Sequence, residues 1–287
     1  MSRIRPRDVM LGSLVLISLA SFAGCGGLEL SSVWRDREVK IDGIPTEWQG
    51  TTTYVEDSSV AVGIMNDDDY LYVSLSTSLR SVAAQIMARG LTVWLDPEGG
   101  KQKSFGIRCP IGAPQEMDDP SQFSKITQDR DKFTDMILEK LESSVEQLEI
   151  IGPTEDDVIR LFPSQLAGLE VRLGHQDGRF LYEVKIPLRS TDQHPYSIGM
   201  DEGSYVGLGF ETAEIDQDKM REATGGKMPR GAVPGGDMPG RGPGGGGKRG
   251  GGMRGGGMGG GREPGGDSRI MPERLELWTK VKLASAD

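Results

Sequence analysis

Apolar and polar residues alternate with a period of two along much of this chain. Such alternation sends successive side chains to opposite faces and is typical of strands with one buried face. The clearest runs are Val60–Ile64, Leu71–Leu75, Leu91–Leu95, Phe105–Cys109, Leu169–Leu173 and Phe180–Ile186. The pattern therefore predicts an all-β protein.

Turn sequences join two pairs of these runs. Asn66–Asp69 separates the second run from the first, and Asp177-Gly178 lies between the last two. Asn and Asp suit such tips because their side chains bond the local backbone, and Asp-Gly between alternating runs is a strong hairpin signal. We therefore expect two β-hairpins within an antiparallel β-sandwich.

Two segments have helical spacing, Ser81–Arg89 and Asp131–Val145. In the second, the apolar positions are Phe133, Met136, Ile137 and Leu141. We expect both to be short helical insertions that cover the sheets. The last run, Leu275–Leu283, alternates again and is predicted to complete a sheet.

Residues 225–266 interrupt the strands just before that last run. They hold 22 of the 42 glycines and few apolar side chains, so too little surface can be buried to offset the entropy of ordering. We predict a disordered insert, with the sandwich formed by residues 34–224 and 268–287. The insert has a net charge of +5, which leaves two interpretations, a solvated loop or weak attachment to anionic envelope polymers.

The N-terminus carries an export signal. Three arginines within the first eight residues precede Val9–Ala23, an apolar run too short to be a confident membrane span. The run ends in Ala23-Gly24-Cys25, which resembles the lipobox of bacterial lipoproteins, although Phe22 stands where Leu is usual. We predict a signal peptide over residues 1–24, lipid attachment at Cys25 and a tether over 25–33. A secreted protein or an uncleaved anchor is the alternative.

Charge and cysteine content agree with an extracytoplasmic, membrane-anchored protein. Removing three arginines and one aspartate with the signal peptide takes the net charge from −10 to −12, which argues against a nucleic-acid partner. Cys109 then has no intramolecular partner, and its place on an apolar strand face predicts a small buried side chain. A reactive thiol is the alternative.

Three motifs in order resemble carbohydrate-binding module family 9. They are Ile41-Asp-Gly followed by Trp48, then Asp67–Val73, and then a strand that ends in Asp96-Pro97. The resemblance covers roughly residues 38–110. It implies a jelly-roll-like sandwich that binds sugar without catalysis, with two aromatic rings clamping the sugar and calcium supporting nearby loops.

The resemblance indicates candidate site residues. Trp94 and Trp48 are the candidate sugar contacts, although either ring could instead serve packing, and aromatic residues make up only 6% of the chain. Asp67, Asp69 and Asp96 supply the hard oxygen ligands that calcium prefers, but they lack EF-hand spacing, so solvated acidic turns are the alternative.

Motifs for catalysis are absent from the sequence. It contains no G-x-S-x-G, no H-E-x-x-H and no Cys/His metal spacing, and His175 and His194 lie beside turn residues. We therefore expect no enzyme, although paired carboxylates for glycoside hydrolysis stay open.

The sequence leaves two classes of function. The first is a cell-envelope lipoprotein that binds a glycan or another extracellular ligand. The second is a structural lipoprotein that scaffolds a protein partner. An exposed aromatic pair over a groove would favour the first, and an apolar patch or an unpaired sheet edge the second. The sequence carries no indication of an oligomeric state.

Overall fold

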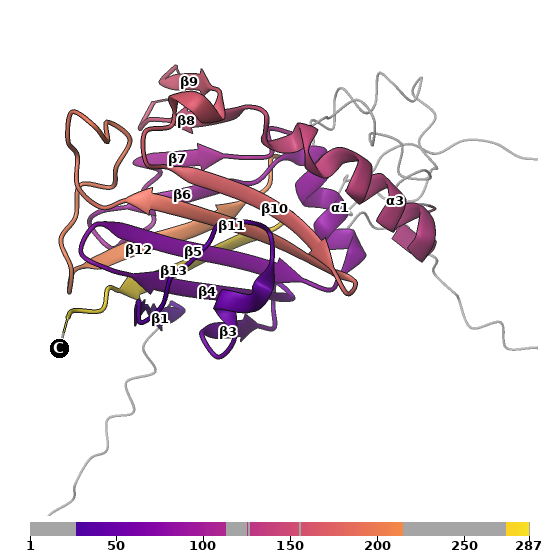
Figure 1. Ribbon diagram of the computed structural model, residues 1–287, viewed down its shortest axis with the longest axis horizontal. Helices are drawn as coiled ribbons and strands as arrows, with labels where there is room; N and C mark the ends of the chain where they lie inside the picture. Colours follow the sequence, from indigo (N-terminus) through magenta and orange to yellow (C-terminus); the bar gives the residue numbers. More distant parts are fainter. Residues whose placement is uncertain (1–26, 113–124, 126, 155, 215–273, 287) are drawn as a thin grey trace, which may run out of the picture.

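Two β-sheets pack face to face in the computed structural model (Figure 1), which describes residues 27–112, 125, 127–154, 156–214 and 274–286. The predicted signal peptide, Cys25 and the insert 225–266 lie outside the described residues. The seven-stranded sheet has the spatial order β1 (Glu29–Ser31), β13 (Glu276–Lys282), β12 (Tyr205–Glu211), β6 (Thr92–Asp96), β7 (Phe105–Arg108), β8 (Leu148–Ile151), β9 (Val158–Leu161).

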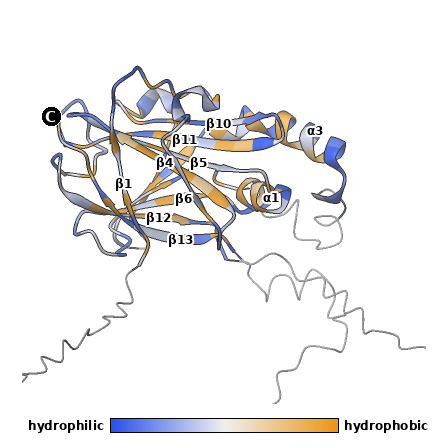
Figure 2. Cartoon of the chain, turned by 90° about the horizontal axis from the view of Figure 1, so that it is seen from below, coloured by the Kyte–Doolittle hydropathy of each residue, from blue (hydrophilic) through white to orange (hydrophobic). Residues whose placement is uncertain are grey.

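The six-stranded sheet forms the other layer. Its order is β10 (Glu170–Gln176), β11 (Arg179–Pro187), β5 (Tyr70–Thr77), β4 (Val60–Asn66), β2 (Val33–Trp34), and β3 (Thr52–Val55) also pairs with β4. Figure 2 shows β10, β11 and β5 in one layer and β12, β13 and β6 in the other. The predicted β-sandwich is confirmed.

The core lies between the two sheets because the period-two pattern sends one face of each strand inward. Leu71, Val73 and Leu75 of β5 are completely buried, and so are Leu95 of β6 and Phe210 of β12. They belong to one apolar cluster that joins both layers. Burying a side chain of this size stabilises the fold by about 1.5–3 kcal/mol.

Both predicted hairpins are present. Asp67 makes the first turn, since its Oδ1 accepts the backbone N–H groups of Asp69 at 2.9 Å and Tyr70 at 2.7 Å. In the second, Gln176 pairs with Arg179, so the loop has two residues, and both Asp177 and Gly178 have positive φ. That backbone conformation is the one that matches strand twist in two-residue hairpins.

The helices cover one end of the sandwich (Figure 1). They are α1 (Arg80–Arg89) and α3 (Arg130–Leu141), and short 3₁₀ turns occur at η1 (Pro45–Trp48), η3 (Ser143–Val145) and η4 (Pro163–Gln165). Both predicted helices are therefore confirmed, with the second ending earlier than expected. No helix in the described part of the chain has the length and apolar character needed to span a membrane.

The structure departs from a purely antiparallel sandwich at two short strands. The sheets are mixed, because β1 runs parallel to β13 and β2 runs parallel to β4. Both short strands come from one N-terminal segment, so the predicted tether over 25–33 instead contains β1 and the start of β2. Strands of two or three residues have no detectable periodicity, and the unpaired edges of β13 and β4 decide where they pair.

Candidate functional site

A row of alternating tryptophan and glycine crosses the outer face of the seven-stranded sheet. The strand register pairs Trp278 of β13 with Gly209 of β12, Gly209 with Trp94 of β6, and Trp94 with Gly106 of β7. Directly paired residues point to the same side of a sheet, so both rings lie on the face that points away from the core.

The glycines provide the space in which the rings lie. A Cβ atom added at Gly209 would be 2.7 Å from Cε2 of Trp278, and one added at Gly106 would be 2.7 Å from Cζ3 of Trp94. Each indole therefore packs against the backbone of the neighbouring strand, with one face on the sheet. This arrangement orients a flat aromatic surface outward without a supporting side chain.

The two rings differ in what covers them. The ammonium group of Lys103 lies 5.4 Å from the centre of a Trp94 ring, Nε1 of Trp94 donates to Glu211 at 3.0 Å, and the residue is only 7% exposed. Trp94 is therefore neither an inter-sheet core residue nor an open platform. Trp278 is partly exposed, so its ring can meet a ligand.

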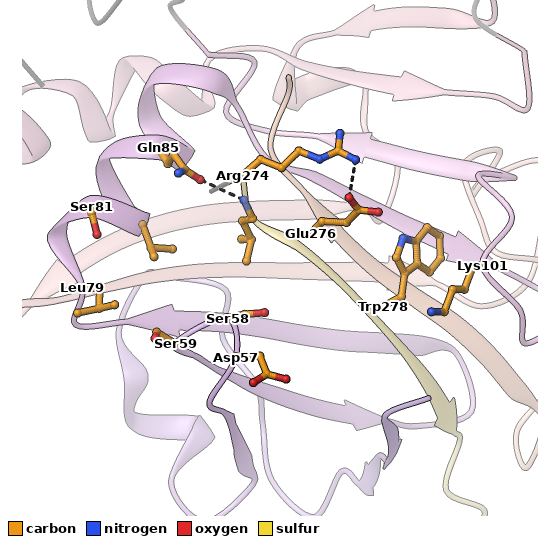
Figure 3. Close-up of a pocket in the computed structure, with 12 residues that line it drawn as sticks. Asp57, Ser58, Ser59, Leu79, Ser81, Gln85, Lys101, Arg274, Glu276 and Trp278 are labelled. Carbon is orange, nitrogen blue, oxygen red and sulfur yellow. Dashed lines mark hydrogen bonds and ion pairs between the residues drawn. The ribbon is translucent and has the colours of Figure 1, made fainter. Parts of the chain in front are cut away.

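A groove of about 600 Å³ lies beside Trp278 (Figure 3). It is bounded by the β3–β4 turn, the start of α1 and the start of β13. Its polar lining comprises Asp57, Ser58, Ser59, Ser81, Gln85, Lys101, Arg274 and Glu276. A second hollow of about 180 Å³ shares Trp278 and Lys101 with it, so the indole stands between two concave surfaces.

The start of β13 is held rigidly against this groove. The buried Oε1 atom of Gln85 in α1 accepts the backbone N–H of Leu275 at 3.1 Å. Arg274 forms ion pairs with Glu276, with Glu214 at 2.6 Å and with Glu211 at 3.2 Å. The guanidinium group of Arg274 and the carboxylate of Glu276 are thus held beside Trp278.

Trp48, the second candidate sugar contact, is a packing residue. It is 3% exposed and belongs to a small apolar cluster on the outer face of the six-stranded sheet, together with Val39, Ile41, Met65 and Tyr72. The first of the three motifs therefore covers this sheet, and Trp48 offers no ring face to a ligand.

A buried carboxylate completes the environment of Trp48. Nε1 of Trp48 donates to Oε1 of Glu183 at 2.5 Å, and the backbone N–H groups of Gly43 and Asp42 donate to its Oε2 at 2.6 and 3.1 Å. Burial raises the pKa of Glu183 to about 7. Glycine is required at position 43, since its φ is +83° and a Cβ would be 2.7 Å from the Leu173 carbonyl oxygen.

The three aspartates proposed for calcium lie in two places, with Asp67 and Asp69 in the β4–β5 turn and Asp96 at the end of β6. Both oxygens of Asp67 have protein donors, with Arg35 and the hydroxyl of Tyr72 on Oδ2. Asp96 is fully buried, and its two oxygens accept the N–H groups of Glu98 and Gln102 at 3.1 and 2.8 Å. Asp69 is exposed.

Within the described ranges, no cluster of three or more His, Cys, Asp or Glu side chains could hold a metal ion. Asp67, Asp69 and Asp96 therefore do not form such a cluster.

Cys109 is buried, as predicted from its strand face. It is 1% exposed, and burial raises the pKa of its thiol to about 12. The thiol is therefore protonated at neutral pH, which argues against the alternative of a reactive cysteine.

Comparison with solved structures found distant likenesses. No family model matches the chain, and no curated protein does. Two solved structures similar to it are carbohydrate-binding family 9 modules from Caldicellulosiruptor kristjanssonii. The module in complex with glucose shows 10% identity and a TM-score of 0.31, covering 67% of this chain and 80% of that one.

The module in complex with cellotriose shows 11% identity and a TM-score of 0.32, with 66% and 79% covered. A protein from Bacteroides uniformis that is described as carbohydrate-binding shows 12% identity and a TM-score of 0.34, with 65% and 83% covered. Likenesses this distant concern the fold and say nothing about what this chain binds.

Trp278 is the site residue that the sequence reasoning missed. A signal for it exists, because Leu277 and Val281 face the core and so place Glu276, Trp278 and Lys280 outward. An aromatic residue on an otherwise charged strand face is unusual for a purely solvated surface. The neighbouring groove, in contrast, is built from segments far apart in the sequence.

Proposed function

We propose that this protein is a non-catalytic carbohydrate-binding lipoprotein of the bacterial cell envelope, with its glycan site in the Trp278 groove. The observation that carries the proposal is the partly exposed indole that lies on Gly209 between two hollows. Aromatic faces stack on the C–H groups of sugars, while neighbouring polar groups bond the hydroxyls.

The composition of the groove supports a neutral glycan. Carboxylate oxygens of Asp57 and Glu276 accept hydroxyl hydrogens, and Arg274 and Lys101 donate to hydroxyl oxygens. A volume of about 600 Å³ lies within the range of small-molecule sites and suits a short oligosaccharide. The motif resemblance over residues 38–110 supports the same class of function.

Replacing the ring tests this assignment. We expect Trp278→Ala to weaken binding of the best glycan on an array by at least about tenfold, because a buried tryptophan often dominates a binding interface. Tyr54→Ala is the matched control, since Tyr54 is 62% exposed on β3 and does not line the groove. Equal affinities of the two variants, measured by calorimetry, would reject the Trp278 groove as the glycan site.

The membrane anchor is the second part of the proposal. It is supported by the basic start, the apolar run and Ala23-Gly24-Cys25, and it places the protein outside the cytoplasm. Cys25→Ala should move the protein from the membrane fraction to the soluble fraction. Retention of the variant in the membrane would contradict acylation at Cys25.

One surface favours the alternative function, scaffolding of a protein partner. Strand β9 pairs only with β8 among the described strands, and it exposes Val158 and Ile159 by 41% and 51%, with Phe162 exposed by 54% just after it. Apolar edge strands are templates for pairing with another chain. If Ile159→Lys abolishes self-association or partner binding while glycan binding persists, this second function is supported.

A further inference from the structure

The β10–β11 hairpin meets the helices at one end of the sandwich (Figure 1). A separate hollow lies there, lined by residues of the hairpin and of both helices. Its volume is about 260 Å³, and its lining includes Arg80, Arg130, Thr134, His175 and Asp177. It shares no lining residue with the Trp278 groove. The segment before and into α1 separates the two, with Ser78 and Arg80 lining this hollow and Leu79 and Ser81 lining the groove.

Arg130 brings to this hollow a positive charge that forms no ion pair among the described residues. Its Nη2 atom would be 3.7 Å from a Cβ at Gly178, so the guanidinium lies close to the hairpin tip. Within the described residues it has no hydrogen-bond or ionic partner, although Asp177 lines the same hollow. Its N–H donors therefore remain available to a ligand.

Arg80 and His175 face the same space. Arg80 donates one N–H to the carbonyl of Gln128 at 3.3 Å and has further guanidinium N–H groups. The His175 imidazole packs against Phe133 in an edge-to-face arrangement, with the ring centres 6.0 Å apart. Burial and the charge of Arg130 lower the pKa of His175 below its ordinary value.

Charge selects the kind of ligand. Two guanidinium groups face this hollow against one carboxylate, whereas the whole chain has a net charge of −10. A guanidinium presents parallel donors that match two oxygens of a carboxylate, sulfate or phosphate. The volume is below that of a typical drug-sized site, which limits the occupant to one small anionic group.

We propose that this hollow is an oxyanion site in which Arg130 and Arg80 hold a carboxylate or sulfate group, with His175 as a third donor when protonated. The inference does not rest on the Trp278 groove. The oxyanion can belong to an acidic sugar or be a free inorganic ion, and both have the same chemistry at the site.

The proposal predicts a defined pH dependence. The charges facing His175 are Arg80 from the start of α1, Arg130 from the start of α3 and Asp177 from the hairpin. A bound anion favours the protonated imidazole, so the anion should raise the pKa of His175 and bind more tightly as the pH falls towards about 6. A neutral sugar should not raise the pKa of His175, and its binding should not become tighter as the pH falls.

The test is an NMR titration of the His175 ring with sodium sulfate, glucuronate and glucose at constant ionic strength. We expect sulfate or glucuronate, but not glucose, to shift the His175 signals and raise its pKa. Arg130→Gln should weaken this anion binding by at least about tenfold, because a charge-assisted hydrogen-bond pair is lost.

Arg179→Gln is the matched control, since it removes the same charge from an exposed position of the same hairpin, outside the hollow. A response to glucuronate alone assigns the site to acidic sugars, and equal responses to both anions assign it to free oxyanions as well. No response to either anion, or an equal loss in the two arginine variants, would overturn the proposal. Glycan binding in the Trp278 groove is measured separately, so the two proposals fail independently.

Discussion

Glu183 links the stability of the sandwich to pH. Its carboxyl group is fully buried on β11 and receives N–H groups from Trp48, Gly43 and Asp42. Burial raises its pKa from an ordinary 4.5 to about 7; the hydrogen bonds from Trp48 and Gly43 lower it, and repulsion from Asp42 and Glu47 raises it further. The folded protein therefore holds this proton more tightly than the unfolded chain does.

The sign of the effect follows from proton counting. Between pH 4.5 and about pH 7 the unfolded chain has lost the proton of Glu183 while the folded protein retains it. The free energy of unfolding therefore falls as the pH rises through this window. The stabilising contribution of Glu183 is complete below its pKa in the unfolded chain and is lost above its pKa in the folded protein. The difference between these two pKa values corresponds to about 3 kcal/mol of unfolding free energy.

Urea unfolding of the wild type and Glu183→Gln measures this contribution. Glutamine does not titrate, so the free energy of unfolding of the wild type relative to the variant should fall by about 3 kcal/mol from about pH 5 to about pH 8. The difference between the two proteins removes the contribution of His175. The lowered pKa of that residue makes the free energy of unfolding rise with pH below 6.5, opposite to the effect of Glu183.

Glu170→Gln is the control, because it removes an exposed carboxylate that pairs with Lys185. It should leave the pH slope of the wild type nearly unchanged. A wild-type advantage over Glu183→Gln that stays constant or grows with pH would refute the reasoning. It would mean that the three N–H donors outweigh burial and keep Glu183 ionised.

Three further changes test the groove, the closing strand and the insert. Gly209→Ala would place a Cβ 2.7 Å from the Trp278 ring, and we expect glycan affinity measured by calorimetry to fall by about tenfold. Unchanged affinity would show that the position of the ring does not depend on glycine at 209. Deleting the chain after Ser268 removes β13 from between β1 and β12 and should abolish cooperative thermal unfolding, so a normal melting transition would contradict its structural role. Replacing residues 225–266 with a short Gly-Ser linker should change the free energy of unfolding, measured by thermal unfolding, by only about 1 kcal/mol. It should also reduce the salt-sensitive retention of the protein on anionic cell-wall polymers. A large loss of stability would show that the insert is ordered.

The sequence alone determined the strands that have one buried face. Alternation over five or more residues reports burial directly, because a slip of one residue would expose a whole apolar face. The two hairpins, both helices and the closing strand were therefore predictable, and so was the buried state of Cys109. Turn residues such as Asp177-Gly178 also made the hairpin connections predictable, because their backbone preferences depend on the local sequence alone.

Only the tertiary structure decided the parallel pairing of β1 and β2 and the composition of the groove. Very short strands carry no period of their own, and their partners are the free edges of distant strands. The sequence also does not show what covers an outward-facing ring. Lys103 and Glu211 enclose Trp94, while Trp278 on the same row stays partly open. Which tryptophan can meet a ligand therefore depends on contacts between segments far apart in the chain.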